Sequence, residues 1–303
     1  MKRPPAPNNK HLPPKAPAAP QPPPPPARAT PPTPATEARL LERVCQGLEA
    51  LRLPLVRETL DDYLAQPRED LTRLEWLWTL LERQVGQRLE GRIERRIRES
   101  KLPARKTLEA FDFDFQPELD RSLVLELATL RFLDRGFNVL LAGMSGTGKS
   151  HLAMALALVA CTANRRVRYT TSADMLGALK LALAADTLEA TLKEYTGAEL
   201  LVIDEVGMEQ VERGVASRAG LLQKVLLPRY GERQLSTIVT SNIPWASWGE
   251  YLGDQLGAAA LLDRLLHHSH VLVINGPSYR EHVHKQEVAK KKSSPAKNSK
   301  DPG

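Results

Sequence analysis

The stretch NVLLAGMSGTGKSHLAMALALVA, residues 138–160, decides the fold of this chain. Residues 138–142 are apolar enough for a buried strand, and residues 151–159 have the Ala and Leu content of a helix. Between them, residues 143–150 match the pattern G-x-x-x-x-G-K-[S/T] at every fixed position. Glycines between a strand and a helix let successive backbone N–H groups turn inward, and the helix N-terminus adds its positive end. The stretch therefore predicts a phosphate-binding loop.

The residues of this loop are all expected to contact a nucleotide, and they are Gly143, Met144, Ser145, Gly146, Thr147, Gly148, Lys149 and Ser150. We expect Lys149 to reach the β- and γ-phosphates and the Ser150 hydroxyl to ligate Mg²⁺. The predicted cofactors are thus ATP and Mg²⁺.

Further short apolar runs at residues 139–142, 167–170, 200–203 and 237–240 alternate with helical stretches. Continuous apolar runs of this length are typical of buried parallel strands. We therefore expect a three-layer α/β domain with a parallel sheet over residues 104–284. Its ligands should bind at the carboxyl ends of the strands.

Two carboxylates, Asp204 and Glu205, follow the apolar run at 200–203. A buried strand can carry charge only where it emerges, and that end is expected to face the nucleotide. We expect Asp204 to hold the metal, directly or through water, and Glu205 to act as the general base on the attacking water. The alternative is a solvated strand end. The pair favours hydrolysis over simple binding.

Asn242 occupies the equivalent position after the run at 237–240. It could donate to the γ-phosphate or orient the water, although asparagine at a strand end is also a common turn residue.

The two ends of the chain differ from its middle in composition. Residues 1–35 hold fifteen of the 24 prolines and five Lys or Arg with no acid, which predicts a disordered basic leader; a docking peptide for a Pro-binding domain is the alternative. Residues 36–103 carry three helical patterns and predict a small all-helical domain. Residues 285–303 are rich in Lys and predict a second disordered tail.

The bulk composition predicts a cytoplasmic protein. No stretch approaches the roughly eighteen apolar residues that a membrane helix needs. The two cysteines, Cys45 and Cys161, have no metal or redox spacing, as expected for thiols in a reducing compartment.

Residues 40–280 resemble the IstB-like transposition helper ATPases, which are AAA+ proteins related to DnaC-type helicase loaders. The resemblance is carried by the phosphate loop and by LEAFDF at 108–113, TSNIP at 240–244, WGE at 248–250, ALLDRLLHH at 260–268 and GPSYR at 276–280. The segment 208–224 fits poorly. The resemblance implies an ATPase that assembles head to tail on DNA and works with the transposase of the same mobile element. The alternatives are a helicase loader in DNA replication and, less well supported, a small-molecule P-loop kinase.

The resemblance also implies roles for single residues. Arg264 would be an arginine finger inserted into the neighbouring subunit's ATP, with Arg229 as a rival; otherwise Arg264 pairs with a nearby acid such as Asp263. Arg280 would be a second phosphate-sensing arginine. Asn242 would take the role called sensor 1.

Two further groups of side chains have two interpretations each. Phe111 or Phe113 would lie near the adenine, or residues 111–115 are only an extended segment docked on the core. Arg88, Arg92, Arg95 and Arg96 share one helix face, which is a solvated surface or a stripe that contacts DNA without sequence preference. The histidines at 267, 268 and 270 are expected to pack rather than bind metal.

Overall fold

The computed structural model describes residues 34–65, 71–208, 217–230 and 234–293. It divides into two compact units, residues 1–84 and residues 85–303. Of the predicted leader, only Pro34 and Ala35 are described, and they begin a helix. Part of the poorly matching segment, residues 209–216, also lies outside the described residues.

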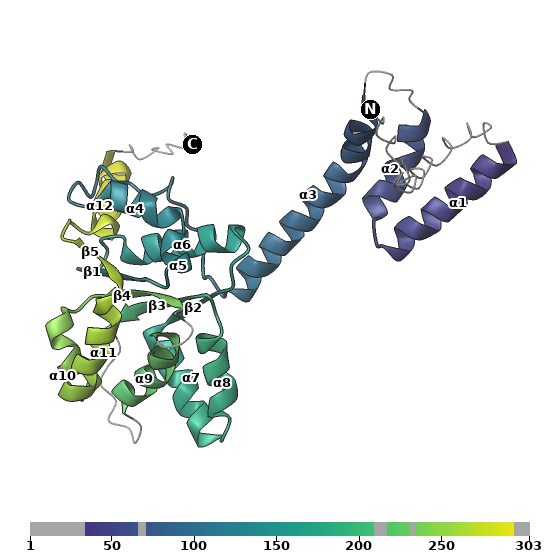
Figure 1. The fold of residues 1–303 in the computed structure, drawn as a ribbon. Helices are drawn as coiled ribbons and strands as arrows, with labels where there is room; N and C mark the ends of the chain where they lie inside the picture. The colour runs from purple at the N-terminus through teal and green to yellow at the C-terminus, as the bar shows by residue number, and fades with distance from the viewer. Residues whose placement is uncertain (1–33, 66–70, 209–216, 231–233, 294–303) are drawn as a thin grey trace, which may run out of the picture. The chain divides into compact units, whose positions relative to one another are not determined.

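The first unit is all helical, as predicted. It contains α1 (Pro34–Ala50), α2 (Pro54–Ala65) and the start of α3 (Arg73–Glu99) (Figure 1). Proline fits the first helical position because its missing N–H would have no partner there. Val56, Leu60 and Leu80 form the small buried core of this unit.

The division between the units falls inside α3, between Gln84 and Val85, whereas the sequence predicted a boundary at residues 103–104. The second half of the helix belongs to the larger unit: Ile93 and Ile97 pack in its core, and Arg96 Nε donates to Asn164 Oδ1 at 3.1 Å. Helical periodicity marks one continuous helix, but it does not show that its two halves pack on different cores.

The second unit is built on a parallel sheet with the strand order β2-β3-β4-β1-β5 (Figure 1). The strands are β1 (Asn138–Gly143), β2 (Val167–Thr171), β3 (Leu200–Val206), β4 (Ser236–Ser241) and β5 (Ser269–Ile274). The first four coincide with the predicted runs. The edge strand β5 was not predicted, although its residues 271–274 also form a short apolar run.

Helices cover both faces of this sheet (Figure 1). One side carries α4 (Arg121–Ala128), α5 (Arg131–Asp134), α6 (Lys149–Thr162) and α12 (Tyr279–Ser293). The other carries α7 (Ser172–Ala184), α8 (Leu188–Thr196), α9 (Arg218–Tyr230), α10 (Trp248–Leu252) and α11 (Gln255–His267), with the short 3₁₀ helix η1 (Trp245–Ser247) before α10.

Strand residues alternate between the two cores that result: Val202 packs on the α6 side, and Leu201 and Ile203 pack on the α7 side. The predicted three-layer α/β domain with a parallel sheet is confirmed.

The C-terminal boundary differs from the prediction. Helix α12 continues through Ser293, so residues 285–293 are helical and not part of a disordered tail. Residues 294–303 lie outside the described part of the chain. None of the described helices combines the length and apolar character needed to cross a membrane.

Candidate nucleotide site

A cavity of about 280 Å³ lies at the carboxyl ends of the strands. Five segments that are far apart in the sequence line it: residues 106–116, the phosphate loop, the end of β3, the end of β4 and the start of α12. Most of the predicted site residues meet here, namely Phe111, Ser145, Gly146, Thr147, Gly148, Lys149, Ser150, Glu205, Asn242 and Arg280. Arg264 does not.

The loop between β1 and α6 requires glycine. Gly146 and Gly148 have φ values of 83° and 102°, which L side chains rarely adopt. A Cβ on Gly146 would lie 2.2 Å from Ser278 Oγ, and one on Gly148 would lie 2.6 Å from the Phe111 ring. The loop is therefore packed against both the preceding segment and the start of α12.

Lys149 begins α6 and is only 4% exposed. Its Nζ donates to the carbonyl oxygens of Gly143 and Met144, both at 2.8 Å. The pKa of Lys149 is lowered to about 8: burial is the largest cause, Asp204 opposes it, Arg280 adds to it and Glu205 opposes it. Phosphate oxygens near the amine would favour its charged form. The lysine is thus held by the loop at the position where a phosphate would meet it.

Asp204 lies against the start of α6 and is 2% exposed. Its Oδ1 accepts hydrogen bonds from Ser150 Oγ at 2.9 Å and from the Thr240 hydroxyl, and its Oδ2 accepts one from the Tyr169 hydroxyl. Burial raises the pKa of Tyr169, and the bond to Asp204 raises it further, so the phenol stays protonated. Ser150 and Asp204 together present the hard oxygen ligands that Mg²⁺ prefers.

Glu205 occupies a β-bulge. Its φ is 63°, and the pairing of β3 with β4 shifts register between Ile203 and Val206. Ile203 and Val206 both pack in the core on the α7 side, so the bulge removes Glu205 from the alternation and leaves it lining the cavity. Its N–H donates to Thr240 Oγ1 at 2.9 Å. Such a conformation costs a non-glycine residue about 1–3 kcal/mol, and such strain is most often found at functional sites.

Asn242 follows β4 directly and lines the same cavity as Glu205. Its N–H donates to the Val206 carbonyl at 3.3 Å, which ties the ends of β3 and β4 together. The turn after it is fixed by Ser241, whose Oγ donates to the Ile243 carbonyl at 2.8 Å. Asn242 therefore lies at the carboxyl end of β4, as the sequence predicted, and lines the same cavity as Glu205.

The segment before the phosphate loop provides aromatic walls. Phe111 lines the cavity, and its ring lies edge-on to Phe113 with 4.9 Å between centroids. Phe113 is half-buried against the same core and does not line the cavity, so Phe111 is the better candidate for the adenine contact. Phe115 and Tyr279 also line the cavity, with centroids 5.2 Å apart. Sequence reasoning missed their contribution; alternation of Phe with Asp at 111–115 was the available signal.

The start of α12 is attached to the loop. The Tyr279 N–H donates to the Gly146 carbonyl at 3.0 Å, and the buried Gln116 donates from Nε2 to the Pro277 carbonyl at 3.0 Å. These bonds hold Arg280 at the cavity wall. The GPSYR run at 276–280 thus lies beside the phosphate loop although about 130 residues separate them in the sequence.

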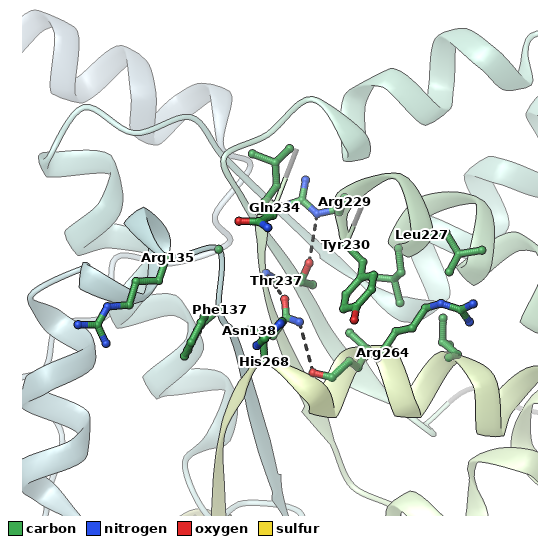
Figure 2. Close-up of a pocket in the computed structure, with 15 residues that line it drawn as sticks. Arg135, Phe137, Asn138, Leu227, Arg229, Tyr230, Gln234, Thr237, Arg264 and His268 are labelled. Carbon is green, nitrogen blue, oxygen red and sulfur yellow. Dashed lines mark hydrogen bonds between the residues drawn. The ribbon is translucent and has the colours of Figure 1, made fainter. Parts of the chain in front are cut away.

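Arg264 lines a second cavity, of about 320 Å³, which Figure 2 shows. Asn138 and Thr237, near the starts of β1 and β4, also line it. The second cavity therefore lies at the amino ends of the strands, and the first lies at their carboxyl ends. Arg264 is exposed, and its Nη1 donates to the Ala260 carbonyl at 2.9 Å. In the described part of the chain no ion pair joins Arg264 to Asp263. One copy of the chain does not bring Arg264 to its own phosphate loop.

Arg229 is buried, with 1% of its surface exposed. Its guanidinium donates to Thr237 Oγ1 at 3.1 Å, visible in Figure 2, and to the carbonyls of Tyr195, Ala198 and Ser236 at 2.8, 2.7 and 2.5 Å. Burial lowers its pKa to about 9. These bonds all lie inside its own subunit, which indicates a structural role for Arg229 and favours Arg264 as the candidate finger.

The histidines at the end of α11 and the start of β5 make ring and hydrogen-bond contacts. His267 Nδ1 lies 3.1 Å from the Tyr230 hydroxyl, and His268 stacks on Phe137 with 5.4 Å between centroids. His270 lies 5.8 Å from the same Phe137 ring. These contacts agree with the packing role that we expected.

Comparison with known proteins places residues 46–287 in the family described as "IstB-like ATP binding protein". The chain is 41% identical to the insertion sequence IS21 putative ATP-binding protein of Pseudomonas aeruginosa, over 70% of this chain and 78% of that protein. It is 35% identical to the IS5376 putative ATP-binding protein of Geobacillus stearothermophilus, over 79% of this chain and 94% of that protein.

Among solved structures, the DnaC helicase loader is similar with a TM-score of 0.41 and 24% identity, covering 52% of this chain and 92% of the loader. DnaA from Aquifex aeolicus bound to AMPPCP has a TM-score of 0.47 and 20% identity, covering 65% of this chain and 59% of DnaA.

Proposed function

Because the chain belongs to the family of IstB-like ATP-binding proteins, we propose that it is an ATP-hydrolysing helper of DNA transposition. The observation that supports hydrolysis is the position of Glu205, which lines the same cavity as Lys149 and Ser150. A binding-only site does not need a second acid, directed into the cavity by a strained bulge, beside the phosphate loop. The adenine would lie near Phe111.

Each residue of the site has a separate role in the proposed hydrolysis. The loop N–H groups and Lys149 hold the phosphates in place for in-line attack. Ser150 and Asp204 would hold Mg²⁺, which supplies positive charge to the β- and γ-phosphates. Glu205 accepts the proton of the attacking water, Asn242 orients that water, and Arg280 supports the γ-phosphate.

Lys149→Ala tests the nucleotide site. The amine would make at least two charged hydrogen bonds to phosphates, each contributing about 1.5 kcal/mol or more, so ATP affinity should fall at least about 100-fold. Affinity is measured by titrating a fluorescent ATP analogue. Lys193→Ala, on the exposed surface of α8, is the matched control and should bind normally. Equal affinity for Lys149→Ala and the wild-type protein would show that the nucleotide binds elsewhere.

The partners follow from the names of the relatives, which are insertion-sequence proteins. We propose that this chain works on DNA with the transposase of its own mobile element. The helicase-loader alternative is less well supported, because the relatives that match most of the chain are named for insertion sequences. Copurification with a transposase rather than a hexameric helicase distinguishes the two.

The proposed DNA contact is the exposed basic face of α3. Arg88, Arg92 and Arg95 are exposed, while Arg96 is half-buried and bonded to Asn164. Arg95 also pairs with Glu99 at 2.8 Å, an exposed ion pair that phosphate can replace at little cost. The stripe is therefore Arg88, Arg92 and Arg95, one residue fewer than the sequence predicted.

Replacing these three arginines together with glutamine should weaken DNA binding and reduce its dependence on salt. Each lost phosphate contact lowers the slope of log affinity against log salt by roughly 0.9. Binding to duplex DNA is measured over a range of salt concentrations. Arg39, Arg43 and Arg73, changed together, give a charge-matched control elsewhere on the chain. An unchanged slope, together with loss of binding when residues 1–33 and 294–303 are deleted, would show that the ends of the chain bind the DNA.

A further inference from the structure

A tyrosine hydroxyl that no motif predicts contacts the acid of the proposed metal site. Tyr169 lies in the middle of β2, is 7% exposed, and donates from its hydroxyl to Asp204 Oδ2. Asp204 itself is 2% exposed. The hydrogen bond therefore joins two groups that are both withdrawn from water.

The register of the sheet explains how the two side chains meet. Tyr169 pairs with Val202 and Thr171 pairs with Asp204, so Asp204 is the diagonal neighbour of Tyr169 on the same face of the sheet. Diagonal neighbours are about 7–8 Å apart, a distance that an aromatic side chain can span. That face is covered by α6, which carries Ser150. The tyrosine side chain is therefore long enough for its hydroxyl to reach the Asp204 carboxylate.

Neutral hydroxyls make the hydrogen bonds to the Asp204 carboxylate. Oδ1 accepts from Ser150 and Thr240, and Oδ2 accepts from Tyr169. Among the described residues no ion pair involves Asp204. A buried carboxylate has lost its hydrogen bonds to water, so each hydroxyl that donates to it matters to its orientation. Thr240 also accepts from the Glu205 N–H, which connects this network to the bulge that carries the proposed base.

We propose that Tyr169 is a positioning residue for Mg²⁺: its hydroxyl fixes the Asp204 carboxylate so that Oδ1 faces Ser150. The inference rests on the proposed function of the site. Residues that orient metal ligands influence metal binding through those ligands, and losing one typically costs about 10–100-fold in metal affinity. Tyr169 holds Oδ2 from β2, on the side of β3 away from β4. Oδ1 of Asp204 then stays beside the Ser150 hydroxyl.

Tyr169→Phe removes only the hydroxyl and keeps the ring in the core. Binding of a slowly hydrolysed fluorescent ATP analogue is titrated against Mg²⁺ at fixed protein and nucleotide. We expect the half-saturating Mg²⁺ concentration to rise about 10–100-fold. Affinity for the analogue in EDTA should equal that of the wild-type protein. Saturating Mg²⁺ should restore kcat for ATP hydrolysis to the wild-type value. A purely structural role would instead lower binding with and without Mg²⁺.

Tyr195→Phe is the matched control, because Tyr195 is 2% exposed and packs in the core on the opposite side of the sheet. It should keep the wild-type Mg²⁺ dependence. If Tyr169→Phe does not fold, 3-fluorotyrosine placed at position 169 supplies the readout. Its ¹⁹F resonance should shift when Mg²⁺ and analogue are added together and stay fixed with analogue alone.

The outcomes separate this inference from the proposed function. If the wild-type protein binds the analogue with no dependence on Mg²⁺, the proposed function fails. If the wild type depends on Mg²⁺ and Tyr169→Phe has the same half-saturating concentration, the inference about Tyr169 is wrong and the proposed function stands. A ¹⁹F resonance that does not move when Mg²⁺ and analogue are added together would likewise show that Tyr169 does not position the metal.

Discussion

Replacing Glu205 with glutamine is expected to slow ATP hydrolysis about 10³-fold while ATP binds as tightly as before. Glutamine keeps the size and the hydrogen-bonding reach of the side chain but cannot take a proton from water. General base catalysis contributes typically about 10²–10⁴-fold. The bulge at φ 63° should tolerate the change, because the backbone N–H bond to Thr240 does not involve the carboxylate.

Nucleotide affinity and phosphate release are measured separately for this variant. Glu126→Gln, on the exposed surface of α4, is the matched control and should hydrolyse ATP at the wild-type rate. The variant at Glu205 should accumulate in an ATP-bound state. Wild-type turnover in Glu205→Gln would show that another group activates the water.

Arg264→Ala is expected to leave ATP affinity largely intact and to lower turnover about 10³-fold or more, the contribution typical of an arginine finger. The physical reason is location. Arg264 lines the cavity at the amino ends of the strands, whereas Lys149 lies at their carboxyl ends. Within one copy, Arg264 therefore cannot neutralise charge on the γ-phosphate. If Arg264 is the finger, a second copy brings it there, as the resemblance to AAA+ proteins implies. Turnover should therefore rise faster than linearly with protein concentration.

Mixing two inactive variants tests this arrangement. Arg264→Ala supplies an intact phosphate loop and Lys149→Ala supplies an intact finger, so some interfaces in the mixture combine both and activity should partly return. Arg135→Ala is the control, because Arg135 is exposed and lines the same second cavity. It should not lower turnover. Absence of complementation, with specific activity independent of concentration, would make Arg264 a structural residue.

The parts of the site that the sequence predicted are those with strong local signals. The phosphate loop follows from one octapeptide between a strand and a helix, and its glycines have the positive φ values that the pattern requires. Asp204 and Asn242 follow from polar residues directly after apolar runs. Parallel strands bring such ends to one edge, so chain order alone predicted their meeting.

The parts that the sequence did not predict depend on contacts between distant segments. Strand β5 is the exception, because its apolar run at residues 271–274 was a local signal that the prediction missed. The bulge at Glu205 leaves no local sequence signal, because glutamate is not a residue that favours its positive φ of 63°. The bond from Tyr169 to Asp204 depends on the register of β2 against β3, which no single segment encodes.

The most direct test of the proposed site is a structure of the protein with Mg²⁺ and a slowly hydrolysed ATP analogue, assembled on duplex DNA. We predict phosphates within the loop at Lys149, Mg²⁺ beside Ser150 and Asp204, and Glu205 near the γ-phosphate. Arg264 of an adjacent copy should face the same γ-phosphate. A nucleotide bound outside this cavity, or a metal held away from Ser150, would contradict the proposed site.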